Sequence, residues 1–189
     1  MFDASRWSQL WVALALPCPT GPVFEGLQAR YAEPHRAYHT WQHIQECLTE
    51  FDRVRDAANH PAEVELAILF HDLVYDPRRP DNEEQSARLA IEVLKGAGAA
   101  PGVIARVGQL ILATEHNEMG LEGDEALLVD IDLSILGAGS ERFLEYESQI
   151  RSEYAWVPQG LFRAKRAEVL GRFLDRPTVF TTPEFVALE

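Results

Sequence analysis

The chain has 189 residues, of which 47% are hydrophobic and 25% charged, so it has the size and composition of one globular domain and not of a disordered protein. Its formal net charge of -13 excludes broad attraction to duplex nucleic acid, because binding to the phosphate backbone needs clustered Lys and Arg. The apolar stretch SQLWVALALPCP is short for a membrane span and lacks the basic flank of a signal peptide, so a cytoplasmic location away from membranes is expected.

Hydrophobic residues recur with a helical period along nearly the whole chain, and the alternating runs of a sheet protein are absent. The expected fold class is all-α, a single-domain helical bundle. We expect helices at 4–16, 21–32, 40–58, 62–75, 83–98, 102–114, 124–137, 140–155 and 160–175, then a short turn at Thr182 and Pro183. Pro61 is expected to open the fourth helix, and Asn82 and Ser140 to cap the fifth and eighth.

Two of these helices, ELAILFHDLVY and EALLVDIDLSILG, are apolar on all sides, which is typical of central, buried helices. Each carries ionisable residues inside its apolar run, and an unpaired buried charge is costly. In the first, His71 and Asp72 lie about 100° apart around the helix, so both side chains can converge on one point. The pair suits a metal site, and it equally suits a hydrogen bond between two buried groups.

The segment PHRAYHTWQHI places His39 and His43 four residues apart, a spacing that puts both on one helical face. His43 is the better candidate for a metal ligand, because Ile44, Cys47 and Leu48 continue an apolar stripe beside it. His39 is expected beside the metal ligands or near substrate. The two cysteines show no CxxC spacing, so imidazole and carboxylate are the expected ligand types.

In the second apolar helix, Asp130 and Asp132 are about 200° apart, so only one of them is expected to reach the same metal ion. Asp132 has Leu128, Val129, Ile135 and Leu136 as helical neighbours, and we place it on the more apolar, more buried face. Its alternative role is to accept a hydrogen bond from a buried donor.

The order His, His-Asp, Asp on an all-helical chain resembles the HD-domain superfamily of metal-dependent phosphohydrolases. The resemblance is closer to a bacterial subgroup of predicted HD-superfamily hydrolases and covers roughly residues 30–180. It is carried by the segments YHTWQHI, LFHDLVYDPRRPDNEEQSA, ILATEHN, VDIDLSILG and IRSEYAWVP. The whole chain, 1–189, is thus expected to be one HD-like metal-binding domain.

The resemblance implies that His43, His71, Asp72 and Asp132 bind a divalent metal ion, with Mn, Mg, Zn, Fe, Co and Ni all open. The expected function is hydrolysis of a small phosphorylated compound, such as a nucleotide or related phosphoester, by metal-activated water. Whether the enzyme would be a phosphomonoesterase, phosphodiesterase or pyrophosphohydrolase stays open. Neither the substrate nor the oligomeric state follows from the sequence.

The expected catalytic carboxylates are Asp72, Asp76 and Glu83. Asp76 follows Asp72 by four residues, on the same side of the expected helix, and would orient the water or act as a turn residue before Pro77. Glu83 would manage protons, or it would only favour the dipole of its helix from the first turn.

The expected substrate-binding residues are Arg36, His39, Arg78 and His116, although the two arginines are also explained as surface charges. His116 follows a helix end and is open to three roles: a substrate contact, a ligand of a second metal ion, or a partner of the helix dipole. The segment FRAKRAEVLGRFLDR has two alternative interpretations: its cations form a locally positive pocket for a small anion, or they form a solvated helix face. These cations are Arg163, Lys165, Arg166, Arg172 and Arg176.

Two other functions remain open at this point. The wider HD fold also hosts di-iron chemistry, so a di-iron oxygenase is one alternative. A non-catalytic metal-binding sensor or interaction module is the other, because a bound metal can be purely structural.

Overall fold

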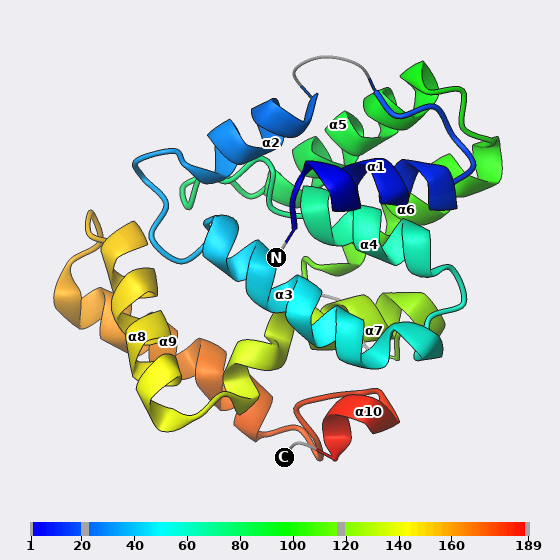
Figure 1. Cartoon of the computed structure of the whole chain (residues 1–189). Helices are drawn as coiled ribbons and strands as arrows, with labels where there is room; N and C mark the ends of the chain where they lie inside the picture. The colour runs from blue at the N-terminus through cyan, green and yellow to red at the C-terminus, as the bar shows by residue number, and fades with distance from the viewer. Residues whose placement is uncertain (1, 20–22, 117–119, 188–189) are drawn as a thin grey trace.

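A computed structural model describes residues 2–19, 23–116 and 120–187, and over this part of the chain it contains helices and no strands. The expected all-α class is confirmed. The α-helices are α1 (Ala4–Ala13), α2 (Val23–Tyr31), α3 (Trp41–Val54), α4 (Pro61–Phe70), α5 (Asn82–Gly96), α6 (Pro101–Ala113), α7 (Gly123–Asp132), α8 (Ser140–Glu153), α9 (Gln159–Leu174) and α10 (Pro183–Val186), and two 3-10 helices, η1 (Arg55–Ala57) and η2 (Leu133–Gly137), follow α3 and α7 (Figure 1).

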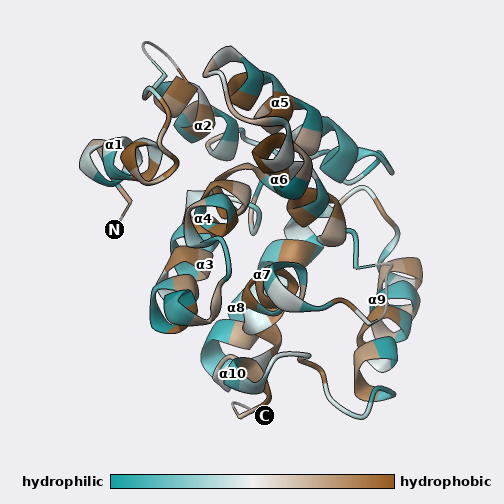
Figure 2. Cartoon of the chain, turned by 90° about the vertical axis from the view of Figure 1, so that its right-hand side faces the viewer, coloured by the Kyte–Doolittle hydropathy of each residue, from teal (hydrophilic) through white to brown (hydrophobic). Residues whose placement is uncertain are grey.

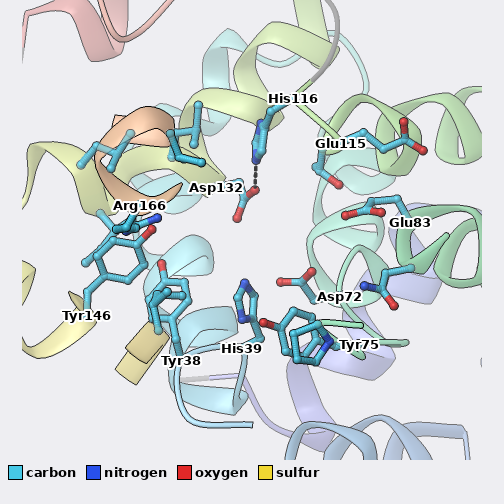
Figure 3. Close-up of a pocket in the computed structure, with 18 of the residues that line it drawn as sticks. Tyr38, His39, Asp72, Tyr75, Glu83, Glu115, His116, Asp132, Tyr146 and Arg166 are labelled. Atoms are coloured by element: carbon cyan, nitrogen blue, oxygen red, sulfur yellow. Dashed lines mark hydrogen bonds and ion pairs between the residues drawn. The ribbon is translucent and has the colours of Figure 1, made fainter. Parts of the chain in front are cut away.

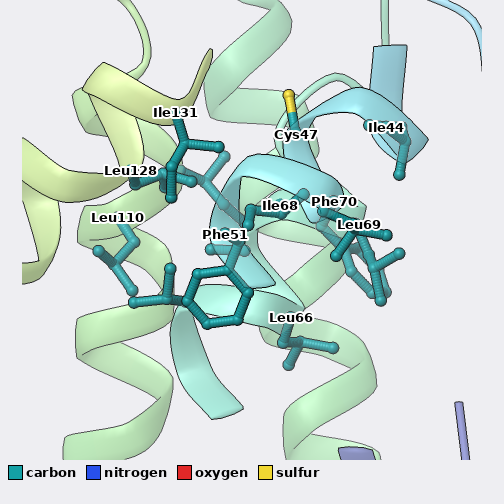
Figure 4. Packing of buried hydrophobic residues seen from close by; sticks show 14 of the residues in the cluster. Ile44, Cys47, Phe51, Leu66, Ile68, Leu69, Phe70, Leu110, Leu128 and Ile131 are labelled. Carbon is teal, nitrogen blue, oxygen red and sulfur yellow. The ribbon is translucent and has the colours of Figure 1, made fainter. Parts of the chain in front are cut away.

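Helix α4 is the centre of the fold, as its uniformly apolar sequence predicts. Every residue from Glu63 to Phe70 is buried, and the helix packs against α1, α3, α5, α6 and α7. Leu66, Ile68 and Leu69 are fully buried in the cluster that Figure 4 shows, together with side chains of α3, α6 and α7. The two glutamates of this helix are paired with arginines of its neighbours, as buried charges require.

The structure ends α4 at Phe70, five residues before the expected boundary, and the reason is local. The Arg36 guanidinium donates hydrogen bonds to the carbonyl oxygens of Asp72 and Leu73, at 2.7 Å and 3.0 Å. These oxygens therefore do not accept the hydrogen bonds of a further helical turn. The backbone N–H of Asp76 donates to the side chain of Asn82, and Pro77 disfavours a helical conformation at the residue before it. His71 and Asp72 therefore lie just past a helix end.

The capping expectations are borne out at one of three positions. Pro61 does open α4. Asn82 is instead the first residue of α5, after Asp81, and its side chain bonds to the backbone of Asp76 and Arg79. Ser140 is likewise the first residue of its helix, and Gly139 precedes it.

A second, smaller hydrophobic cluster lies beside the main core and contains Tyr38, Ile135, Tyr146 and Ile150. It joins the chain before α3 to η2 and α8. Helix α9 is attached to α8 by the ion pair between Arg166 and Glu147 and has no buried residue of its own. Figure 2 shows hydrophobic and hydrophilic residues mixed along the ribbon of α9. None of the described helices is long and apolar enough to cross a membrane.

Candidate metal centre

Four side chains from three regions of the chain converge on one point: His43, His71, Asp72 and Asp132. One nitrogen or oxygen atom of each lies within 4.8 Å of the corresponding atoms of all the others. His43 comes from the buried stripe of α3, His71 and Asp72 from the end of α4, and Asp132 from the last turn of α7. Among the described residues these four form a group that could hold a metal ion, and they are the four that the sequence predicted.

The distances within the group match those between ligands that share one ion. The Nε2 atoms of His43 and His71 are 3.3 Å apart. Asp132 Oδ1 lies 3.0 Å and 3.4 Å from these two nitrogens, and Asp72 Oδ2 lies 3.5 Å and 3.1 Å from them. Metal–ligand bonds of about 2.1 Å at octahedral or tetrahedral angles would separate neighbouring ligand atoms by about 3.0–3.4 Å.

The backbone and neighbouring side chains orient both imidazoles. The Nδ1 atom of His71 lies 2.9 Å from the carbonyl oxygen of Ile68 and donates to it in the neutral tautomer, which directs the Nε2 lone pair to the cluster. The Sγ atom of Cys47 lies 3.6 Å and 3.7 Å from the two ring nitrogens of His43 and so packs against that ring. Both histidine side chains are 2% exposed, and the two aspartates are 12% and 14% exposed.

The cluster favours a positive charge between its carboxylates. Burial disfavours protonation of His71, yet Asp72 and Asp132 outweigh it and raise the pKa of His71 well above its usual value. Burial likewise opposes ionisation of the two aspartates, but the neighbouring histidines, His71 above all, hold the pKa of both carboxyl groups below the ordinary range. With neutral imidazoles the four groups carry two negative charges, which a divalent cation would neutralise.

A cavity of about 520 Å³ opens beside the cluster and gives Asp72 and Asp132 access to a ligand. Three of the predicted catalytic and substrate-binding residues also line it: His39, Glu83 and His116 (Figure 3). So do Arg166, Arg172 and Arg176, three of the five cations that the sequence offered for an anion pocket. Burial and the nearby Asp72 carboxylate raise the pKa of Glu83 above its ordinary value, a shift that is common among groups that exchange protons in active sites. The prediction of a catalytic role for Glu83 stays open.

His116 contacts the outer oxygen of Asp132. Its Nε2 atom lies 3.0 Å from Asp132 Oδ2, while the other oxygen of the same carboxylate faces His43 and His71. His116 adopts a φ of 57°, in the left-handed region that non-glycine residues rarely occupy. This arrangement fits two roles for His116: it orients the Asp132 carboxylate, or it binds a second metal ion together with that carboxylate.

Glu153 of α8 is a site residue that the sequence analysis did not single out. Its fully buried carboxylate accepts hydrogen bonds from the backbone N–H groups of Ala37, Tyr38 and His39 at 2.7–3.0 Å, and from the Tyr75 hydroxyl at 2.7 Å. It also lies 2.7 Å from His39 Nδ1. These contacts fix the chain before α3 and orient the His39 ring, which stacks on Tyr75 with 4.0 Å between ring centroids.

The signal that could have found Glu153 was weak. It lies in the IRSEYAWVP segment of α8, a helix whose other glutamates are half-buried or exposed, and nothing in its spacing distinguishes it from them. Only the packing of α8 against the start of α3 buries it.

The three other predicted site residues, Arg36, Asp76 and Arg78, contact other parts of the chain and do not line the cavity. Arg36 has a fully buried guanidinium that donates to the carbonyl oxygens of His39, Asp72 and Leu73. It thereby fixes the backbone of the turn that carries the ligand Asp72. Asp76 accepts from the backbone N–H of Arg78 in a turn and does not line the cavity, because the helix that would have aligned it with Asp72 has already ended. Arg78 lies 5.2 Å from the ring of Trp156.

The two aspartates of α7 point to different partners, as the 200° argument predicts. Asp130 accepts from the backbone N–H groups of Thr181 and Thr182 and from the Thr182 hydroxyl, and so ties the C-terminal segment to the core. The expectation that Asp132 is the more buried of the two was wrong, since Asp130 is 1% exposed. Burial therefore did not identify the ligand, and the angular argument predicted only that the two carboxylates would have different partners.

No protein-family model, curated protein or solved structure matches the chain. The all-helical fold and the His/Asp group that could bind a metal ion are compatible with an HD-like domain. The resemblance thus rests on the residues of this chain alone.

Proposed function

We propose that this chain is a metal-dependent phosphohydrolase that acts on a small phosphorylated compound. The observation that carries the proposal is the convergence of His43, His71, Asp72 and Asp132 at the wall of a ligand-sized cavity. A purely structural ion would favour a closed site, whereas here two of the four ligand side chains border open space.

The residues present fit a divalent cation, because two neutral imidazoles and two carboxylates suit Mn, Fe, Co, Ni and Zn, and the buried negative charge needs a counter-ion. Once bound, such an ion would lower the pKa of a coordinated water and offset charge on a phosphoryl group.

The side chains around the cluster support the same chemistry. His39, held by Glu153 and Tyr75, borders the cavity and would present its Nε2 atom to a phosphoryl or leaving-group oxygen. Glu83, whose pKa is raised, would exchange a proton with water or the leaving group. Arg166 supplies positive charge on the opposite side of the cavity (Figure 3).

The test is phosphate release by the whole purified chain, stripped with a chelator and reloaded separately with Mn²⁺, Mg²⁺, Zn²⁺, Fe²⁺, Co²⁺ or Ni²⁺. We expect hydrolysis of at least one phosphomonoester, phosphodiester or pyrophosphate in a metabolite panel, and loss of that activity in Asp72→Ala. This variant keeps the carbonyl that binds Arg36, so its helical content should be unchanged by circular dichroism. Absence of release with every ion and substrate would contradict the proposal.

One observation favours a second ion and with it the di-iron alternative. Asp132 turns one oxygen to the two histidines of the cluster and the other to His116, as a carboxylate shared by two ions would. Iron bound at two ions per chain, with oxygen consumption and no phosphate release, would support an oxygenase. Bound metal without either activity would support a sensor or interaction module.

A further inference from the structure

The cavity beside the metal cluster has two chemically different sides. Glu83 and Glu115 lie on one side, Tyr146 and Arg166 lie on the other, and Asp72 and Asp132 lie between them (Figure 3). A phosphoester bound at the cluster is repelled by the glutamate side and attracted by the arginine side. The remainder of the substrate should therefore extend toward Arg166 and the rest of α9.

The α9 side of the cavity combines hydrocarbon with guanidinium groups. Its apolar lining comes from two elements: Leu133 and Leu136 of η2, and Val169, Leu170 and Phe173 of α9. None of these α9 side chains is fully buried: Phe173 packs against the edge of the main core, and Val169 is 40% exposed. Apolar side chains that border a cavity with access to solvent gain free energy when an apolar ligand covers them.

Many polar side chains line the described part of the cavity, but most of them are already bonded within the chain. Tyr75 donates to Glu153, and the arginines at 79, 166 and 172 are paired with Asp81, Glu147 and Glu168. The one side-chain amide of this described lining, Asn82, is bonded to the backbone of Asp76 and Arg79. Its one aliphatic hydroxyl, Thr114, donates to the carbonyl oxygen of Ile111. A ligand rich in hydroxyl groups would lose hydration on this side and would find few unoccupied partners in exchange.

The cations of α9 border this apolar surface. Arg166 lies over the Tyr146 ring at 5.0 Å and is paired with Glu147, and Arg176 lies 4.7 Å from the ring of Phe173. Their guanidinium groups thus add positive charge beside hydrocarbon, a combination that suits a phosphate attached to an apolar group.

We infer that the substrate is a phosphoester of an apolar alcohol or phenol, with its hydrocarbon part against α9 and η2. This inference rests on the proposed function and narrows it, because a nucleotide or a sugar phosphate would place polar groups against the same surface.

The test uses two non-hydrolysable probes, phenylphosphonate and methylphosphonate, whose binding to the Mn²⁺-loaded whole chain is measured by titration calorimetry. They share the phosphonate and differ in the apolar group. We expect phenylphosphonate to bind about tenfold tighter or more, from the apolar area that the ring buries. We also expect it to bind more tightly than adenosine monophosphate, measured by competition.

Two variants locate the effect on α9. Phe173→Ala and the milder Val169→Ser should each reduce the preference for phenylphosphonate severalfold and leave methylphosphonate binding unchanged. The matched control is Leu174→Ala on the same helix, since Leu174 is 81% exposed and does not line the cavity. Its preference should equal that of the wild type.

The outcomes separate this inference from the function on which it rests. If methylphosphonate binds and phenylphosphonate binds no tighter, or if adenosine monophosphate binds best, the apolar substrate is wrong while the phosphohydrolase proposal stands. If neither phosphonate binds the metal-loaded chain, the proposed function fails and the inference fails with it.

Discussion

Replacement of Glu153 by Gln tests whether a buried carboxylate holds the site together. The pKa of Glu153 is lowered from 4.5 to about 2: burial opposes ionisation, but His39 and the backbone N–H groups of Ala37 and His39 outweigh it. A shift of this size corresponds to about 3 kcal/mol of stability, at about 1.4 kcal/mol per pKa unit. Glu153→Gln removes the charge and turns an NH₂ group toward backbone donors, so we expect a loss of about 3 kcal/mol.

The effect should also depend on pH. A carboxyl group whose pKa is lower in the folded state stabilises the fold fully above its unfolded pKa, and the contribution disappears as the pH falls through the folded pKa. The stability gap between wild type and Glu153→Gln should therefore be present at pH 5 and should narrow between pH 4.5 and 2.

The assay is urea unfolding followed by far-ultraviolet circular dichroism at several pH values, with melting curves as a second measurement. A loss of about 3 kcal/mol should lower Tm by about 6–12 °C in a chain of this size. Glu145→Gln is the matched control on α8, because Glu145 is 53% exposed and lies 3.6 Å from Arg142. The reasoning is refuted if Glu153→Gln is as stable as this control, or if the gap does not change with pH.

Three further substitutions separate structural from metal-binding roles. Asp130→Ala should destabilise the chain by about 2–3 kcal/mol in urea unfolding, because it removes a buried carboxylate that accepts hydrogen bonds from Thr181 and Thr182. Metal content by mass spectrometry should stay at the wild-type level, and loss of metal here and not in Asp132→Ala would contradict the choice of Asp132 as the ligand. Arg36→Met should lower the free energy of unfolding by about 3 kcal/mol or more and weaken Mn²⁺ binding in calorimetry, because the carbonyl of Asp72 loses its hydrogen-bond donor. Unchanged Mn²⁺ affinity would mean that Arg36 does not position Asp72 for the metal. His116→Ala should keep the first ion and lose any second one, and an unchanged ratio of two ions per chain would exclude His116 as a ligand.

The central helices could be predicted from local periodicity, whereas the set of four metal ligands came from the resemblance to the HD-domain superfamily. Leu66, Ile68 and Leu69 lie in an all-apolar run that only a buried helix tolerates. The angular separation of Asp130 and Asp132 likewise follows from the helical repeat, and the structure confirms their different partners.

What the sequence could not predict depends on contacts between distant segments. Asp76 was placed beside Asp72 on the assumption of a continuous helix, but the bonds from Arg36 to the carbonyls of Asp72 and Leu73 help to end that helix. Glu153 reaches residues 37–39 across more than a hundred positions, and no local pattern records such a contact.

The measurement that tests the central claim most directly is the Mn²⁺ affinity of the chelator-treated chain, compared with that of its single alanine variants at His43, His71, Asp72 and Asp132. The site geometry predicts stoichiometric binding by the wild type and a loss of at least about a hundredfold in each variant, with helical content retained. Wild-type affinity in a folded variant at any of the four positions would contradict the claim that these side chains together hold the ion.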